Sequence, residues 1–157
     1  MTTEHGYRVA VRWTGNTGVG TANYRGYGRD HDVTAQGKPT LRASADPAFR
    51  GTPDRWNPEE LLVASLSQCH MLTYLSLCAR AGVVVLDYAD EASGVMREEP
   101  GNTGRFAEVV LRPEVTVADA SMVGRAEQLH GRAHEDCFIA RSVAFPVRHV
   151  PSVRPAG

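Results

Sequence analysis

The residues best suited to chemistry in this chain are its three cysteines, Cys69, Cys78 and Cys137. Two of them lie in the longest apolar stretch, ASLSQCHMLTYLSLC at 64–78, where His70 directly follows Cys69. A free cysteine in such a stretch is most often a small apolar packing residue. The same thiol, once ionised, is a nucleophile that can attack peroxides and bind metals. Cys69 is therefore either a core residue or the reactive centre of the protein.

A zinc site is not expected from these residues. Three is an odd number of cysteines, and no CxxC motif is present. Cys69 and His70 are adjacent, so on a helix their side chains point about 100° apart and converge poorly on one ion. His134 and Cys137 are three residues apart and could share a helix face, but no second pair completes a four-ligand site. We therefore expect neither a metal nor another cofactor.

Length and composition are those of an ordinary globular domain. The chain has 157 residues, of which 42% are apolar, enough for a single domain with a true core. Its net charge of −1 gives no reason to expect nucleic acid or an anionic membrane as a partner. We expect no membrane span and no secretory signal, because no run of 18 apolar residues occurs and the N-terminus lacks an apolar segment. We therefore expect a cytoplasmic protein, in which a disulfide is catalytic or redox-sensing rather than structural.

The element that must position Cys69 is a helix over 57–82, NPEELLVASLSQCHMLTYLSLCARAG. Asn57 suits the N-cap, Pro58 the first helical position and Gly82 the C-terminal end. Apolar residues surround this helix almost completely, which predicts burial on more than one side. One side of the helix carries Leu62, Leu66, Cys69, Leu72 and Ser76.

Strands and a second helix are expected around this central helix. An N-terminal β-hairpin region is expected over 1–40, because apolar and polar residues alternate there and glycine-rich turns interrupt the pattern. The expected elements in chain order are a half-buried strand at 7–14, an irregular segment at 41–57, strands at 83–98 and 105–118, a helix at 119–137 capped by Asp119, a strand at 143–150 and a tail at 151–157. This order predicts a single α+β domain over 1–157, with helices packed against antiparallel sheets.

Two segments resemble the signatures of a known family. NPEELLVASLSQC at 57–69 and AHEDCFIARSVAFPV at 133–147 are similar to those of the OsmC/Ohr family, the osmotically inducible protein C and organic hydroperoxide resistance proteins. The resemblance extends through the order of elements over nearly the whole chain, with the OsmC-like branch the better match. It implies an intertwined homodimer that reduces organic hydroperoxides with cysteine thiols and is recycled by an external dithiol.

The resemblance also implies roles for individual residues. Cys69 matches the peroxidatic cysteine, Cys137 the resolving cysteine that forms a disulfide with it, and Glu59 the active-site glutamate. Cys78 has no counterpart in this scheme and is expected to pack in the core. His70 stands where many members have phenylalanine, which bears on the substrate pocket more than on the chemistry.

The reaction also requires a cation near Cys69. Peroxide reduction needs a thiolate, whereas burial disfavours the anion. A guanidinium would stabilise both the thiolate and the leaving oxygen, and a carboxylate would orient it. The OsmC-branch arginine precedes the NPEE segment, so Arg50 in FRGTPDRWNPEE is the best match. The Ohr branch takes its arginine from the first hairpin, and Arg25 and Arg29 therefore remain alternatives.

The spacing of Glu59 and Cys69 predicts that the site is shared between two chains. They are ten residues apart on one helix, roughly 15 Å along its axis, so Glu59 does not easily reach the thiol of its own chain. Antiparallel helices across a two-fold axis would bring Glu59 of one chain to Cys69 of the other. His70 and His134 are expected to be structural or surface residues. Two other functions remain open, a dimer that binds a small apolar ligand or senses redox state, and a purely structural dimer.

Overall fold

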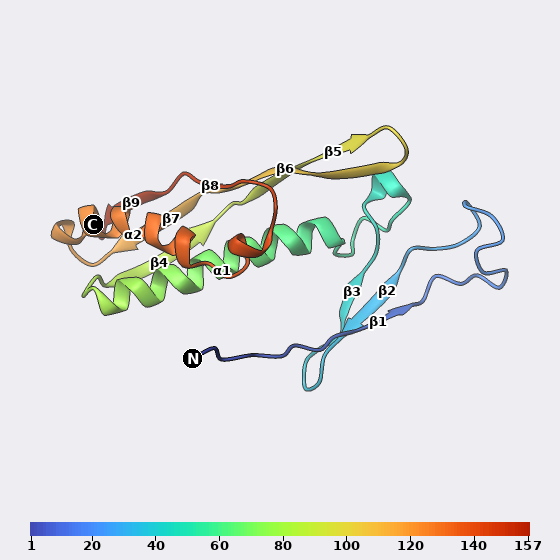
Figure 1. Cartoon of the computed structure of the whole chain (residues 1–157), viewed down its shortest axis with the longest axis horizontal. Coiled ribbons are helices and arrows are strands. Elements are labelled where there is room, and N and C mark those ends of the chain that lie inside the picture. The colour runs from blue at the N-terminus through green and yellow to red at the C-terminus, as the bar shows by residue number, and fades with distance from the viewer. The chain divides into compact units, whose positions relative to one another are not determined.

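The computed structural model describes all residues from 1 to 157 and confirms the α+β class. The chain divides into two compact units, residues 1–61 and 62–157, each described by itself below. Three three-stranded sheets and two long helices make up the regular structure (Figure 1). Both cysteines that the sequence marks as reactive, Cys69 and Cys137, belong to the second unit.

The first unit is an antiparallel sheet with long connections. Its strands are β1 (Ala10–Trp13), β2 (His31–Thr34) and β3 (Leu41–Ala43), paired in that order, and the short helix η1 (Pro47–Phe49) follows. The hairpin region expected at 1–40 is therefore present. The strand expected at 7–14 is shorter than predicted, and the segment expected to be irregular at 41–57 contains both β3 and η1.

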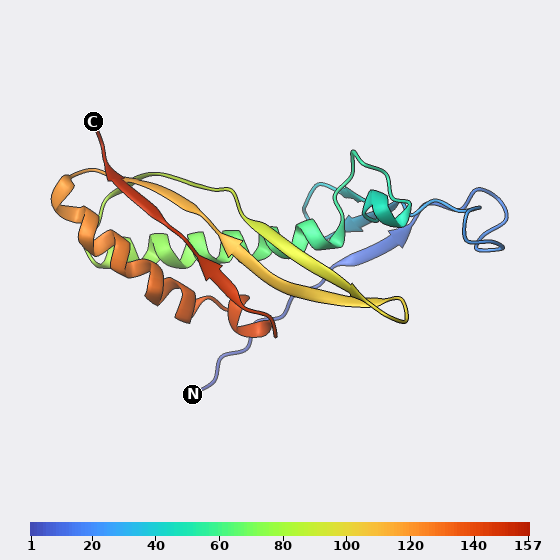
Figure 2. The same ribbon diagram turned by 90° about the horizontal axis from the view of Figure 1, so that it is seen from above.

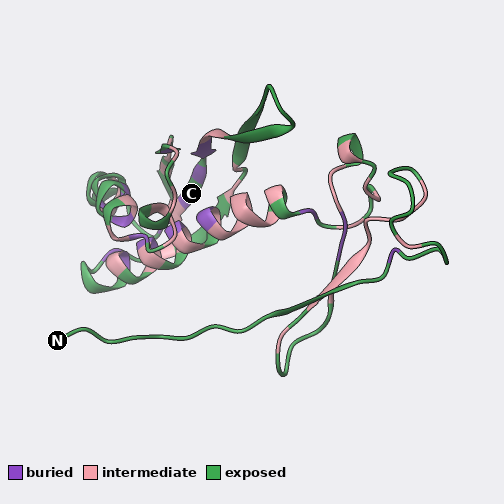
Figure 3. Cartoon of the chain, turned by 45° about the vertical axis from the view of Figure 1, so that its right-hand side comes forward, coloured by how far each residue is buried: buried purple, intermediate pink, exposed green.

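The half-buried face predicted for the first strand is exposed in the single chain. Tyr7, Val9 and Val11 are 90%, 70% and 65% exposed, and Trp13 is 42% exposed. Figure 3 shows the same in colour, with buried residues scarce in this part of the chain. The alternation correctly predicts a strand, but no core of this unit covers the apolar face of that strand. A three-stranded sheet with an uncovered apolar face needs a further packing partner for stability.

The central helix is confirmed as α1 (Pro58–Arg80), with the predicted ends. The Asn57 side chain accepts a hydrogen bond from the Glu60 amide at 2.8 Å, and Glu60 Oε1 accepts one from the Asn57 amide at 3.3 Å, which forms a capping box. At the other end, Gly82 has a φ of +73°, and the Val83 amide donates to the Cys78 carbonyl. By length and composition α1 could also cross a membrane, a test that the core helix of a soluble protein passes equally.

The burial predicted around all of α1 is wrong for the single chain. Only one stripe is buried, and it consists of Leu66, His70, Tyr74 and Cys78 at intervals of four residues. Leu72, on the side expected to be apolar and packed, is 60% exposed. The stripe that packs thus contains the polar His70 side chain among Leu66, Tyr74 and Cys78, while Leu75 and Leu77 are only partly buried against the core.

The second unit contains two sheets of mixed direction. One has the order β4 (Val85–Asp90), β7 (Pro113–Val117), β9 (Ser152–Pro155), and the other the order β5 (Ser93–Glu99), β6 (Thr103–Leu111), β8 (Val147–His149). The antiparallel pairs are those expected for hairpins, whereas β8 and β9 join their neighbours in parallel. The expected tail at 151–157 therefore contains a strand, because β7 offers it a free edge.

Each of the two long strands expected at 83–98 and 105–118 is in fact two strands. The first breaks after Asp90 and the second at Arg112, so that each half joins a different sheet. Asp90 Oδ1 accepts a hydrogen bond from the Arg112 amide at 2.6 Å, while its Oδ2 accepts one from the Ser67 hydroxyl at 2.5 Å. One carboxylate thus joins both breaks and attaches them to α1, which the strand pattern alone does not reveal.

The second helix is α2 (Val123–Asp136), preceded by the short helix η2 (Ala120–Met122). Asp119 caps η2 by accepting a hydrogen bond from the Ser121 amide at 2.8 Å. The buried side of α2 contains Ala126, Leu129, His130 and Ala133, so the predicted apolar stripe is confirmed with a histidine added. The helix lies beside α1 in the view of Figure 2, and its last turn leads through η3 (Ala140–Ser142) to β8. The strand expected at 143–150 is correspondingly shorter.

The capping box should contribute measurably to the stability of α1. Replacing Asn57 with Ala removes a side-chain acceptor from the first turn, and we expect the free energy of unfolding to fall by about 1 kcal/mol. Asn57→Ser keeps an acceptor at the same position and should lose only a small part of that stability. Denaturant titration of both variants beside the wild type measures the difference. Equal stability of the Ala and Ser variants would show that the cap is not stabilising.

Candidate functional site

Two thiols meet where α1 and the end of α2 approach each other in the second unit. Cys69 lies in the middle of α1 and is partly buried, whereas Cys137 is the C-cap residue of α2 and is only 1% exposed. Their side chains are close enough to form a hydrogen bond. The folded chain therefore brings together the two cysteines that the sequence paired, with no disulfide between them.

The buried thiol of this pair is protonated near neutral pH. Burial raises the pKa of Cys137 to about 11, and the hydrogen bond with Cys69 acts in the same direction. The Ala140 amide donates to Cys137 Sγ at 3.5 Å and offsets part of the rise. The two thiols are thus unequal, since Cys69 is accessible from solvent and Cys137 is enclosed and neutral.

A histidine cluster, made up of His70, His130, His134 and His149, joins α1, α2 and β8. His70 Nε2 of α1 and His130 Nδ1 of α2 are 3.0 Å apart and share a hydrogen bond. Their rings are parallel, with centroids 5.3 Å apart. His149 of β8 lies 5.7 Å from His70 and 5.4 Å from His134, measured between ring centroids.

Tyr74 continues the histidine cluster along α1. Its ring stacks on that of His130 with centroids 3.9 Å apart, and its hydroxyl donates to the Ala126 carbonyl at 3.0 Å. Burial raises the pKa of Tyr74 well above its usual range, so the hydroxyl remains a donor. Polar groups of α1 therefore contact α2 at two successive turns.

The two buried histidines are neutral. Burial is the main cause that lowers the pKa of His70 to about 4; neighbouring His149 and His134 act in the same direction, and Asp90 opposes them. Burial likewise lowers the pKa of His130 to about 3, with contributions from His70 and His149. His130 Nε2 is buried and has no hydrogen-bond partner. The arrangement of lower free energy has the Nδ1–H of His130 donating to Nε2 of His70. It leaves His130 Nε2 as an unpaired acceptor, whereas the opposite arrangement would leave an unpaired N–H at that atom.

Sequence reasoning missed this cluster. It treated His70 and His134 as separate structural residues, a description that fits their packing, and did not single out His130 or His149. A signal was present, because His130, His134 and Cys137 follow one another at helical intervals of four and three residues. No three His, Cys, Asp or Glu side chains are arranged to hold a metal ion.

The predicted arginine and glutamate lie in the first unit. Arg50 ends η1 with a φ of +68°, is exposed, and forms no ion pair within the chain. Glu59 lies in the first turn of α1, and its Oε2 atom is buried without a hydrogen-bond partner. Both charged groups are therefore available for an interaction that the single chain does not provide.

Two other arginines of this unit are already engaged. Arg55 Nε lies 3.2 Å from Asp30 Oδ2, with the side chain 13% exposed, and its Nη1 lies 3.9 Å from Asp32. Arg29, one of the alternatives for the cation, lies over the Tyr27 ring at 3.8 Å and donates to the Tyr24 and Tyr27 carbonyls. Arg25, the other alternative, is exposed.

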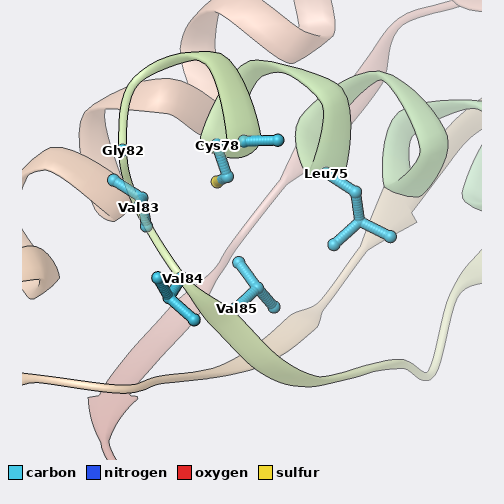
Figure 4. A pocket seen from close by; sticks show the side chains of 7 residues that line it. Leu75, Cys78, Gly82, Val83, Val84 and Val85 are labelled. Carbon is cyan, nitrogen blue, oxygen red and sulfur yellow. The ribbon is translucent and has the colours of Figure 1, made fainter.

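A separate apolar pocket opens at the C-terminal end of α1. It has a volume of about 420 Å³ and does not include Cys69 or Cys137 in its wall. Figure 4 shows the side chains that point into it, with the sulfur of Cys78 among them. The residues that line it are Leu75, Cys78, Ala79, Gly82, Val83, Val84 and Val85. Burial raises the pKa of the Cys78 thiol, which is consistent with the packing role expected from the sequence.

Comparisons with known proteins agree with the resemblance noted in the sequence. Residues 51–150 match the family model described as OsmC-like protein. The structure of an OsmC-like protein of unknown function from Vibrio cholerae is 34% identical, with a TM-score of 0.81 over 96% of this chain and 100% of that one.

More distant similarities point the same way. The uncharacterized protein YmaD of Bacillus subtilis is 26% identical over 125 residues, which are 78% of this chain and 83% of YmaD. An organic hydroperoxide resistance protein OsmC from Legionella pneumophila is 19% identical, with a TM-score of 0.68 over 96% of this chain and 98% of that one. At that identity the likeness shows the fold alone.

The neutral histidines should make the fold acid-sensitive. Their pKa values are lowered in the folded state, so the unfolded chain binds more protons and stability falls as the pH drops below about 6.5. Between pH 7 and pH 5 we expect a loss of about 2 kcal/mol for each buried histidine, measured by denaturant titration. His130→Gln should lose less stability over this range than the wild type. His5→Gln, a change in the exposed N-terminal segment, should not alter the slope, and an unchanged slope for His130→Gln would contradict the assignment.

Proposed function

Since the chain belongs to the OsmC-like protein family, we propose that it is a cytoplasmic thiol peroxidase that reduces organic hydroperoxides. Cys69 is the peroxidatic residue and Cys137 the resolving residue. The observation that carries this proposal is the pairing of one accessible and one buried, protonated thiol within hydrogen-bonding reach. The names of related structures support the substrate class, because one of them is an organic hydroperoxide resistance protein.

The first step takes place at Cys69. Its thiolate attacks one oxygen of the hydroperoxide, so an S–O bond forms as the O–O bond breaks. The sulfur takes the terminal oxygen and becomes a sulfenic acid. The departing alkoxide takes up from solvent a proton equivalent to the one released when the thiol ionised, and leaves as an alcohol. The accessible position of Cys69 suits this step, whereas Cys137, enclosed and protonated, resists direct attack on the peroxide.

The second step joins the two sulfurs. Cys137 attacks the Cys69 sulfenic acid, an S–S bond forms, the S–O bond breaks, and the hydroxyl leaves as water with the proton of the Cys137 thiol. Fast closure protects Cys69 from oxidation beyond the sulfenic acid. An external dithiol then reduces the disulfide by thiol–disulfide exchange.

Arg50 and Glu59 complete the site in this proposal. The Arg50 guanidinium stabilises the Cys69 thiolate and the leaving oxygen, and Glu59 orients it through paired hydrogen bonds. Two observations support these roles: Arg50 has no ion-pair partner in its own chain, and one oxygen of Glu59 is buried without a donor. Arg29, by contrast, is held over two tyrosine rings.

A homodimer with shared sites is part of the proposal. Apolar side chains are exposed in both units, including Val9 and Val11 of the first and Leu72 and Leu86 of the second, the last two 60% and 59% exposed. Exposure of this extent on separate elements is typical of surfaces that a second chain covers. The spacing of Glu59 and Cys69 on one helix supports the same arrangement, because Glu59 does not easily reach the thiol of its own chain.

The apolar pocket beside Cys78 favours a second candidate function, binding of a small apolar ligand without catalysis. Apart from the Cys78 thiol, the side chains in its wall are apolar, which suits an apolar ligand. In this alternative Cys69 and Cys137 are structural or sense redox state. The reaction of the thiols with peroxide separates the two functions.

The peroxidase should consume two thiols per chain. When the reduced protein is mixed with cumene hydroperoxide, we expect Cys69 and Cys137 to be lost together as a disulfide, faster than with hydrogen peroxide. Thiol titration and peptide mass mapping measure both. Cys69→Ser should abolish the reaction, while Cys78→Ser should leave it intact. A wild-type protein that keeps all three thiols under excess peroxide would refute the peroxidase and favour the binding function.

The arginine assignment has its own test. Arg50→Met should slow oxidation of Cys69 by at least about tenfold near pH 7, because the thiolate loses its cation. The rate of oxidation should recover as the pH rises, because hydroxide then deprotonates the Cys69 thiol. Stopped-flow measurement of peroxide consumption follows the rate, with Arg25→Met as the matched control. A slow Arg25→Met protein beside a normal Arg50→Met protein would transfer the role to the first hairpin.

A further inference from the structure

The buried contact between α1 and α2 includes polar ring side chains within a largely apolar core cluster. The packed stripe of α1 presents His70 and Tyr74 to α2, and both rings are fully buried or nearly so, with 1% and 0% exposure. Burying two histidines costs free energy unless their ring nitrogens are hydrogen-bonded. The hydrogen bond between His70 and His130 offsets part of this cost. The stripe therefore fixes one relative position of the helices, whereas apolar side chains would tolerate several.

The same two helices carry the two reactive thiols. Cys69 directly precedes His70 on α1, and Cys137 follows His130 by seven residues on α2, which is nearly two full turns and thus the same side of the helix. A displacement of one helix along the other would break the His70–His130 hydrogen bond and separate the sulfurs together. The histidine bond and the thiol contact thus depend on the same helix register.

We infer that His70 and His130 are positioning residues, whose hydrogen bond holds α2 on α1 in the register that brings Cys137 to Cys69. This inference rests on the proposed function in one respect, that closure of the Cys69–Cys137 disulfide is the step served. The histidines do not contact the peroxide in this role and take no proton from it. They raise the effective concentration of one thiol at the other.

Side chains around the pair support a fixed geometry. His149 of β8 stacks on His70, and Tyr74 stacks on His130, so both rings are held from two sides. The Tyr74 hydroxyl bonds to the Ala126 carbonyl, one turn before His130, and restricts α2 a second time. Ala126 and Ala133 are the small residues on this side of α2, and they leave room for the rings between the helices.

The test measures disulfide closure without any peroxide. The reduced protein is equilibrated with mixtures of reduced and oxidised glutathione, and the fraction of Cys69–Cys137 disulfide is determined by mass spectrometry. In this reaction glutathione is first joined to one cysteine and then released as the thiol when the second cysteine attacks, so only the approach of the two sulfurs is tested. We expect His70→Leu and His130→Leu to lower the closure equilibrium at least about tenfold relative to the wild type.

Conservative variants separate positioning from general packing. Gln places an amide nitrogen or oxygen close to the position of His Nε2, and Asn does so for Nδ1, so His70→Gln and His130→Asn should keep closure within about threefold of the wild type. His5→Leu is the matched control. These polar variants also keep the inference testable if the Leu variants fail to fold. Wild-type closure in a folded His70→Leu protein, or a tenfold loss in both polar variants, would overturn it.

A second measurement relates the inference to the peroxidase. In a single turnover with cumene hydroperoxide, the Leu variants should form the Cys69 sulfenic acid at a normal rate and accumulate it, as detected by dimedone labelling, because only closure is slowed. Absence of both the sulfenic acid and the Cys69–Cys137 disulfide in peroxide-treated wild type would refute the proposed function and leave the glutathione result standing. Slow formation and no accumulation in the Leu variants would contradict the positioning role.

Discussion

The hydrogen bond between two neutral, buried histidines is the constraint on which the candidate site depends. It links the middle of α1 to the inner side of α2, and both reactive cysteines lie on these two helices. Neutral imidazoles can occupy such a position because each ring is aromatic and can stack, while its nitrogens still satisfy part of their hydrogen bonding. Asp90 favours a positive charge on His70, but its carboxylate oxygens already accept hydrogen bonds from Ser67 and the Arg112 amide.

The sequence was most informative where local rules act alone. The ends of α1 were predicted correctly because Asn57, Glu60 and Gly82 satisfy the backbone groups of their own helix termini and need no distant partner. The same holds for Asp119 before α2. The pairing of Cys69 with Cys137 came from the family resemblance and not from spacing, since 68 positions separate them in the sequence.

The sequence was least informative where a distant contact decides the structure. The segments at 83–98 and 105–118 read as continuous strands, yet a single carboxylate, Asp90, connects the break in one to the break in the other. The buried stripe of α1 could not be identified from hydropathy, because nearly every side of the helix is apolar and the stripe that packs contains His70 and Tyr74. Which side of α1 is buried depends on ring stacking with residues of α2 and β8, which are far away along the chain.

The two thiols are unequal because they differ in burial. Cys137 at the end of α2 is enclosed, and burial keeps it protonated. Cys69 is partly exposed on α1, so its ionisation depends on groups outside this contact. In the proposed site those groups are Arg50 and Glu59, whose charges have no partner within the chain. Under the proposed function, the second unit supplies the two thiols, and the first unit of a second chain supplies the charged groups that activate Cys69.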